Sequence, residues 1–165
     1  MACGLAISPS KPNVVYALVE AKENGIYRSD DGGSKWRKVG ANGDRPFYFA
    51  EIYCDPKNEN RLYNIFSRVH RSEDGGKTWS ELLDYDHVHP DHHAFWIHPE
   101  DPSFIINGND GGVAISRDRG RKWSYAETLP LGQFYHINVD NEMPYNVYGG
   151  LQDNGSWRGP AYTWQ

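Results

Sequence analysis

The feature that most constrains this chain is an eight-residue pattern, Ser-x-Asp-x-Gly-x-x-Trp, that occurs three times in 165 residues. The three copies end at Trp36, Trp79 and Trp123, so they recur at intervals of 43 and 44 residues. A pattern that returns at a nearly fixed interval predicts an array of similar structural units.

A second pattern keeps the same interval, because a Pro or Asn is followed seven residues later by the middle of an apolar segment. Its four copies are Pro9 to Tyr16, Pro56 to Tyr63, Pro99 to Ile106 and Asn141 to Tyr148. An interval of about 40 to 45 residues with strand-forming composition is typical of four-stranded β-propeller blades. We therefore expect an all-β fold of about three and a half β-propeller blades.

Each unit divides into four short strands rich in β-branched and aromatic residues. The first, channel-facing strands are expected at Gly4–Ile7, Phe47–Cys54, Ala94–Ile97 and Phe134–Val139. The second strands are expected at Val14–Val19, Arg61–Phe66, Phe104–Asn107 and Asn146–Gly149. The third and fourth strands flank the repeated pattern, as Gly25–Ser29 and Lys35–Val39 illustrate.

The repeated pattern itself is interpreted as a hairpin turn. A Ser hydroxyl and an Asp carboxylate can accept the N–H groups that a tight turn leaves unpaired, and Gly supplies a positive φ. The Trp can bury its ring under the turn. We therefore assign a structural rather than a catalytic role to Ser29, Asp31, Gly33, Trp36, Ser72, Asp74, Gly76, Trp79, Ser116, Asp118, Gly120 and Trp123.

Composition and charge exclude several classes of protein. The net charge is −5 with acidic and basic residues interspersed, which argues against a nucleic-acid partner. No apolar run approaches the roughly 18 residues of a membrane span, and the first residues do not resemble a signal peptide. The two cysteines, Cys3 and Cys54, occupy different points of the repeat and are expected to be free thiols.

The three hairpins resemble the Asp-box, or BNR, repeats of sialidase-type, sortilin-type and xyloglucanase propellers. Three further segments, His89–Pro99, Ile106–Val113 and Gly149–Gly155, look like those of bacterial sortilin/VPS10-like propellers often labelled glycosyl hydrolases. The resemblance covers nearly the whole chain and implies a secreted or periplasmic parent protein, whereas the chain by itself leaves its location open. Asp-box repeats specify the fold and are shared by proteins of unrelated function.

Two functions remain open at this point. The first is a non-catalytic binding or scaffold module for a protein, peptide or glycan. The alternative is a fragment of a xyloglucanase-like glycoside hydrolase, which needs two carboxylates about 5 to 10 Å apart across a cleft. Sialidase activity is disfavoured, because Arg28, Arg71 and Arg117 all lie at the hairpins rather than in a cluster on the first strands.

The richest polar segment is the histidine loop, Asp86 to His93, which enters a first strand. No cofactor is required by the sequence, but a divalent metal could be held there by His89, Asp91 and His93, since imidazole and carboxylate suit zinc or a related ion. A strand that alternates regularly would place His93 on one face with Phe95 and would place His92 on the other.

A second candidate set lies in the turns between second and third strands, where Asp110 and Asp153 occupy equivalent positions. Turn chemistry explains such residues, and the alternative is that they bind a sugar or peptide. The candidate ligand-binding residues are Asp110, Gln152, Asp153, Asn154 and Trp157.

We expect one partial propeller domain over residues 1–165, with units at approximately 1–42, 43–86, 87–129 and 130–165. A propeller needs roughly four to eight blades to cover both faces of every sheet. The chain is therefore expected to be a homo-oligomer or the remainder of a larger propeller.

Overall fold

The computed structural model describes residues 3–41, 50–83, 86, 88–126, 129 and 131–162. The regular elements of these residues are all β-strands, in antiparallel sheets. The chain divides into two compact units, Met1–Ala126 and Glu127–Gln165. The predicted all-β propeller-blade fold is confirmed.

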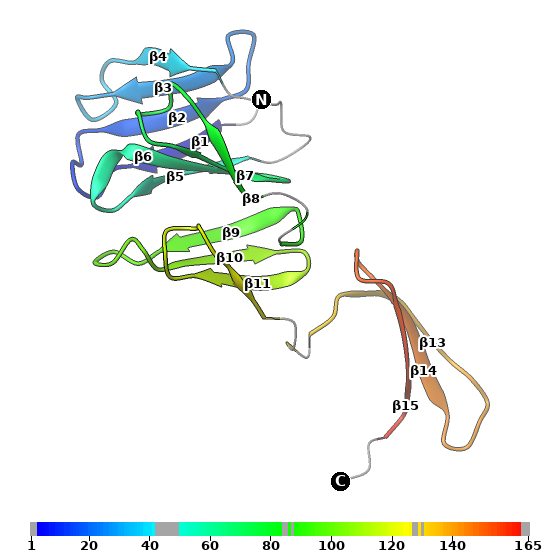
Figure 1. Ribbon diagram of the computed structural model, residues 1–165. Coiled ribbons are helices and arrows are strands. Elements are labelled where there is room, and N and C mark those ends of the chain that lie inside the picture. Colours follow the sequence, from blue (N-terminus) through cyan, green and yellow to red (C-terminus); the bar gives the residue numbers. More distant parts are fainter. Residues whose placement is uncertain are drawn as a thin grey trace. The chain divides into compact units, whose positions relative to one another are not determined.

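The first unit contains three four-stranded sheets, each a meander of consecutive strands (Figure 1). The first blade is formed by β1 (Cys3–Ile7), β2 (Val15–Val19), β3 (Gly25–Ser29) and β4 (Arg37–Gly40). The second blade is formed by β5 (Glu51–Asp55), β6 (Asn58–Ile65), β7 (Val69–Ser72) and β8 (Ser80–Leu83). The third blade is formed by β9 (His92–Ile97), β10 (Ile105–Asn109), β11 (Gly112–Ser116) and β12 (Ser124–Tyr125).

The second unit is a three-stranded sheet in the described residues. Its strands are β13 (Phe134–Val139), β14 (Asn146–Leu151) and β15 (Ser156–Pro160), paired in that order. The predicted first strand Phe134–Val139 coincides with β13, and the predicted strand Asn146–Gly149 extends two residues further as β14. In the second blade the predicted strand Phe47–Cys54 is observed as β5, and Phe47 to Phe49 lie outside the described residues.

The blades of the first unit are joined by two apolar cores. The core between the first and second blades includes Tyr16, Leu18 and Ile26 from one side and Ile52 and Leu62 from the other. The second core lies between the next pair of blades and contains Tyr63, Ile65, Val69, Leu83, Val88, Phe95, Ile105 and Ala114. The second blade therefore contributes to both cores, one from each face of its sheet, because side chains alternate along a strand.

The repeated pattern forms a hairpin with the same bonds in each blade of the first unit. The Ser29 hydroxyl donates to Asp31 Oδ1 over 2.8 Å and accepts the N–H of Gly33, also over 2.8 Å. Asp31 Oδ1 accepts the N–H of Lys35 over 2.8 Å. Corresponding bonds join Ser72, Asp74, Gly76 and Thr78, and Ser116, Asp118, Gly120 and Lys122. In each hairpin the backbone N–H bond to the Asp carboxylate is the main cause that lowers its pKa.

No helix in the described part of the chain is long and apolar enough to cross a membrane. Cys54 is a free, partly buried thiol, and burial raises its pKa to about 11.

Candidate functional site

The third blade carries the histidine loop at the edge where β9 begins and β10 ends. His92, the first residue of β9, pairs with Asn109, the last residue of β10. The turn Asp110-Gly111 then leads into β11, so antiparallel pairing brings this turn beside the end of the histidine loop. Two segments about twenty residues apart in sequence therefore form one polar surface.

A β-bulge decides which histidine is buried. The register of β9 against β10 shifts between Gly108 and Asn109, so Ala94 faces Gly108 while His92 faces Asn109. The bulge turns His92 to the same side as Phe95, where it is fully buried, and leaves His93 exposed. The expectation that His93 would share the face of Phe95 is therefore wrong, because it assumed regular alternation.

His92 is anchored by the neighbouring strand. Its Nδ1 lies 2.8 Å from Oδ1 of Asn107, which is also fully buried. The same Oδ1 of Asn107 also accepts a hydrogen bond from the side-chain amide of Asn109 over 3.2 Å. Burial is the main influence on His92 and lowers its pKa, so the ring is neutral near neutral pH. This buried, hydrogen-bonded pair therefore attaches the end of the histidine loop to the sheet.

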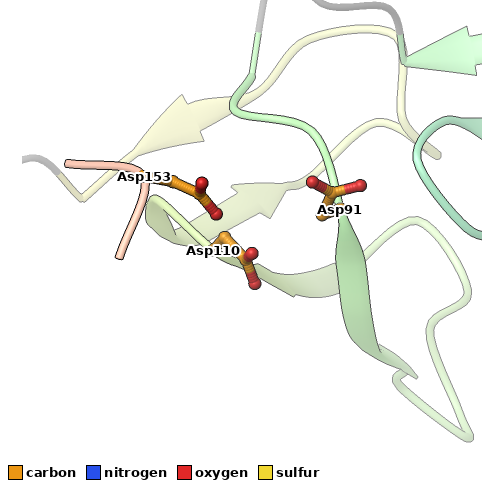
Figure 2. Close-up of side chains that lie close together, drawn as sticks. All are labelled: Asp91, Asp110 and Asp153. Atoms are coloured by element: carbon orange, nitrogen blue, oxygen red, sulfur yellow. The ribbon is translucent and has the colours of Figure 1, made fainter. Parts of the chain in front are cut away.

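Two carboxylates lie at the same edge of the third blade, where β9 begins and β10 ends. Asp91 immediately precedes β9 and has a positive φ of 61°, and Asp110 occupies the β10–β11 turn (Figure 2). Oxygen atoms of the two carboxylates lie within 4.8 Å of each other. His93 Nε2 is 3.1 Å from Asp110 Oδ1, an ion pair when the ring is protonated. The third aspartate labelled in Figure 2, Asp153, belongs to the second unit.

His89 packs tightly over the same turn. A Cβ added to Gly111 would lie 2.5 Å from the His89 Cβ and 2.2 Å from the Tyr125 hydroxyl oxygen, so only glycine fits there. His89 Nδ1 is 3.1 Å from the carbonyl oxygen of Pro90. In the described residues the ligand atoms of His89, Asp91 and His93 do not form one closely spaced group, and Asp91 instead lies close to Asp110. The chemistry that this arrangement offers is a partly buried pair of carboxylates with an adjacent imidazole.

The remaining candidate residues lie in the second unit, at the loop between β14 and β15. The Gln152 side-chain oxygen accepts the Tyr135 hydroxyl, and its amide donates to Asp153 over 3.0 Å. The Asn154 amide donates to the carbonyl oxygen of Gln152 over 2.9 Å. Trp157 follows on β15 and is largely exposed. This loop therefore presents carboxylate, amide and aromatic groups at one end of the sheet.

A groove of about 410 Å³ runs between the first strands of the first and second blades. It is lined by Gly4 to Ile7 of β1 and Glu51 to Cys54 of β5. The Tyr53 hydroxyl donates to the Glu51 carboxylate, and burial together with this bond raises the Tyr53 pKa. The sequence interpretation did not single out Glu51, since one carboxylate in an apolar strand carries no pattern.

The meander sheets, the interblade cores and the repeated hairpins define the chain as a set of β-propeller blades of the Asp-box type. The family model for Sortilin-Vps10, described as "Sortilin, neurotensin receptor 3", matches residues 24–129. The chain belongs to this family. No curated protein matches it.

Several solved structures share this fold. A GH74 enzyme from Niastella koreensis is 16% identical with a TM-score of 0.61, covering 96% of this chain and 28% of its own. The GH74 xyloglucanase from Xanthomonas campestris is 18% identical with a TM-score of 0.55, covering 94% and 28%. YCF48 bound to D1 peptide is 10% identical with a TM-score of 0.54, covering 94% and 49%. The chain thus spans between 28% and 49% of the length of these structures, and at such identities the likeness concerns the fold alone.

Proposed function

We propose that the chain is a non-catalytic binding or scaffold module, and that the third blade recognises a peptide through a cationic group. The observation that carries this proposal is the pair of carboxylates, Asp91 and Asp110, within 4.8 Å of each other on two loops. An ammonium or guanidinium group can bridge two such carboxylates with charge-assisted hydrogen bonds. Rigid sheets with functional loops at their ends suit this role.

The framework under the loops supports binding without large rearrangement. The buried pair of His92 and Asn107 fixes the start of β9, and Gly111 allows His89 to pack onto the turn. A ligand cation would compete with His93 for Asp110, whose carboxylate lies 3.1 Å from the His93 Nε2. The peptide-bound state of YCF48, a neighbour in fold, is an analogy in favour of a peptide ligand.

The loop of Gln152, Asp153 and Asn154, with Trp157, is proposed as a further contact for the same class of ligand. Trp157 is 64% exposed and could stack on an aromatic or cationic side chain, or on a sugar ring. Binding of a glycan instead of a peptide would move the proposed binding site to this second loop.

A divalent cation at the third blade is also proposed for testing. The two carboxylates of Asp91 and Asp110 and the imidazole of His93 suit zinc, in place of the set with His89. Added Zn²⁺ should then raise the melting temperature, and EDTA should lower it to that of metal-free protein. A melting temperature that responds to neither would remove the metal from the proposal.

The main test is binding of fluorescent peptides rich in Lys or Arg, measured by polarisation at two salt concentrations. Asp91→Asn and Asp110→Asn should each weaken binding about tenfold, because each removes one charge-assisted contact. Glu100→Gln removes the same charge from an exposed position outside the site and is the matched control. Binding that survives both Asn variants, or no binding at all, would contradict the proposal.

The competing function is part of a xyloglucanase-like glycoside hydrolase, favoured by the GH74 neighbours in fold. A retaining glycosidase needs two carboxyl groups about 5 to 5.5 Å apart across the scissile bond. If the chain releases reducing sugar from xyloglucan and Asp110→Asn abolishes this release, the hydrolase function would be favoured over the binding function. The family relationship also leads us to infer a secreted or periplasmic parent protein, which fractionation of the source cells would test.

A further inference from the structure

The first blade presents a face that is covered in the other two blades of its unit. Leu5, Ile52 and Phe95 occupy equivalent positions, each four residues before the shared proline. Ile52 and Phe95 are only 4% and 6% exposed, because each packs in the core shared with the preceding blade. Leu5 is 65% exposed, and its neighbour on the same face, Ile7, is 62% exposed. Among the described residues, the first blade therefore has a blade-docking face that stays exposed.

The tryptophans of the hairpins also indicate that this face of the first blade is exposed. Trp79 packs against the core between the first and second blades, and Trp123 packs against the next core. Trp36 donates its indole N–H to the carbonyl oxygen of Gly33 over 2.8 Å, and Trp123 donates to the carbonyl oxygen of Gly120 in the same way. Nevertheless, Trp36 is 42% exposed. By equivalence with Trp79 and Trp123, we infer that its ring belongs to the same docking face as Leu5 and Ile7.

The occupied junctions show what the blade on the other side contributes. At the first junction Tyr16 donates to the carbonyl oxygen of Glu59 over 2.9 Å. Arg28 donates to Oδ1 of Asn60 over 2.7 Å, and its guanidinium lies 5.4 Å from the centre of the Tyr16 ring. At the second junction Tyr63 faces Arg71 across the strands, and Arg71 reaches the carbonyl oxygen of Arg119 over 3.3 Å. A Tyr–Arg pair on one blade thus reaches the next blade at both junctions.

The second unit carries the same pair. Tyr148 follows Asn141 by seven residues, as Tyr16 follows Pro9, and it faces Arg158 across β14 and β15. The Arg158 guanidinium lies 5.6 Å from the centre of the Tyr148 ring. Its ion pair with Glu142 is long, at 3.8 Å, and both side chains are more than half exposed, so this pair holds Arg158 weakly.

The matching acceptor is present on the first blade. Asn13 and Asn60 each lie four residues after the shared proline. Their carbonyl oxygens accept equivalent hydrogen bonds, from the N–H of Gly32 over 2.9 Å and from that of Gly75 over 2.8 Å. Whereas Asn60 receives Arg28 of the preceding blade, its equivalent Asn13 is exposed.

We propose that a second copy of this chain docks on the first blade, head to tail. In this junction the β13–β15 sheet of one copy covers Leu5, Ile7 and Trp36 of the other, and Arg158 of one copy donates to Asn13 of the other. A second copy is the occupant that the observations favour, because one chain carries both halves of a junction that it already uses twice internally. The apolar area supplies the affinity, and the Tyr–Arg pair sets the orientation.

The test is the molar mass of the full chain, measured by sedimentation velocity over a range of concentrations. We expect self-association that Leu5→Asp and Arg158→Glu each weaken about tenfold or more, since a charge is placed in the apolar centre or against the Asn13 acceptor. Met143→Asp changes a residue that is 97% exposed in a turn outside the face and should leave association unchanged. Circular dichroism of each variant shows whether the sheets remain folded.

Mixing the two weakened variants tests the head-to-tail direction. The Leu5→Asp chain retains an intact Tyr148–Arg158 face, and the Arg158→Glu chain retains an intact Leu5 face, so the mixture should form a one-to-one dimer. A wild-type chain that stays monomeric would overturn the proposal and leave a blade of a longer chain as the occupant. Association that neither variant weakens, or a mixture that stays monomeric, would also overturn it.

Discussion

The Nδ1 atom of His92 lies 2.8 Å from Oδ1 of Asn107, and both residues are fully buried at the start of the third blade. Because burial penalises the charged ring, the His92 pKa is lowered from its ordinary value of 6.5. The loop that carries Asp91 and His93 is therefore attached to the sheet through a neutral, hydrogen-bonded histidine.

This relationship predicts a stability that depends on pH. The folded pKa of His92 is lower than the unfolded one, so the unfolded chain binds more protons as the pH falls. Stability is fully present above 6.5, the ordinary pKa, and is lost as the pH falls from there toward the lowered value. Urea unfolding at steps between about pH 7.5 and pH 5 measures this, well above the ordinary range of the carboxylates. His92→Gln should flatten the dependence, and an unchanged slope in that variant would contradict the assignment.

The hairpin glycines predict a contrast between two matched substitutions. Gly33 and Gly76 have positive φ values of 95° and 88°, so Ala is strained at both by about 1 kcal/mol. A Cβ on Gly76 would also lie 3.0 Å from Ile26 Cγ2 in the preceding blade, whereas on Gly33 it would meet only the Trp36 ring, at 3.6 Å. Gly76→Ala should therefore lower the free energy of unfolding more than Gly33→Ala. Equal losses, measured by denaturant unfolding in dilute protein, would mean that the contact with Ile26 is easily relieved.

The junction between the second and third blades predicts the most damaging single truncation. The Phe95 ring packs against Tyr63 and Tyr53, with ring centres 5.1 Å and 5.7 Å away. Phe95→Ala should cost about 3 to 5 kcal/mol, the usual range for a buried aromatic ring. Trp96→Ala removes a larger ring from the opposite face, where it is 46% exposed, and should cost clearly less. Thermal and urea unfolding of both variants compare the two faces, and a reversed order would contradict the observed register.

The Asp74 carboxylate predicts a second, more acidic transition. Hydrogen bonds from the Thr78 N–H and hydroxyl hold its pKa near 2, below the ordinary 3.8. The stabilisation is present above 3.8 and is lost as the pH falls through about 2. Asp74→Ala should cost about 1 kcal/mol at neutral pH, comparable to a lost helix cap. Glu100→Ala is the charge-matched control and should be close to neutral. A similar loss in both variants would point to net charge rather than to the hairpin.

Much of the fold followed from the sequence because its signals are local. The Ser-Asp-Gly-Trp pattern contains every group that the hairpin bonds require, so its spacing placed the turns and the strands on either side of them. The expected strands Gly25–Ser29 and Phe134–Val139 coincide with β3 and β13. The turn of Asp110 was expected between a second and a third strand and lies between β10 and β11.

The candidate site was harder to predict from the sequence, because it depends on the register of β9 against β10. Asp91 and Asp110 are brought together by the pairing of β9 with β10, and the bulge beside Asn109 reverses the expected orientations of His92 and His93. One extra residue in a strand moves a side chain to the other face, and no residue near His93 signals it.

The sequence by itself therefore determined the repeat, the all-β blades and the hairpin chemistry, since these rest on contacts between residues a few positions apart. Only the tertiary structure decided which histidine is buried and which of the equivalent residues Leu5, Ile52 and Phe95 is exposed. Equivalent positions in a repeat have the same local conformation, but their burial depends on the blade that packs against them. For Ile52 and Phe95 that neighbour lies far away in sequence, and Leu5 belongs to neither of the two cores.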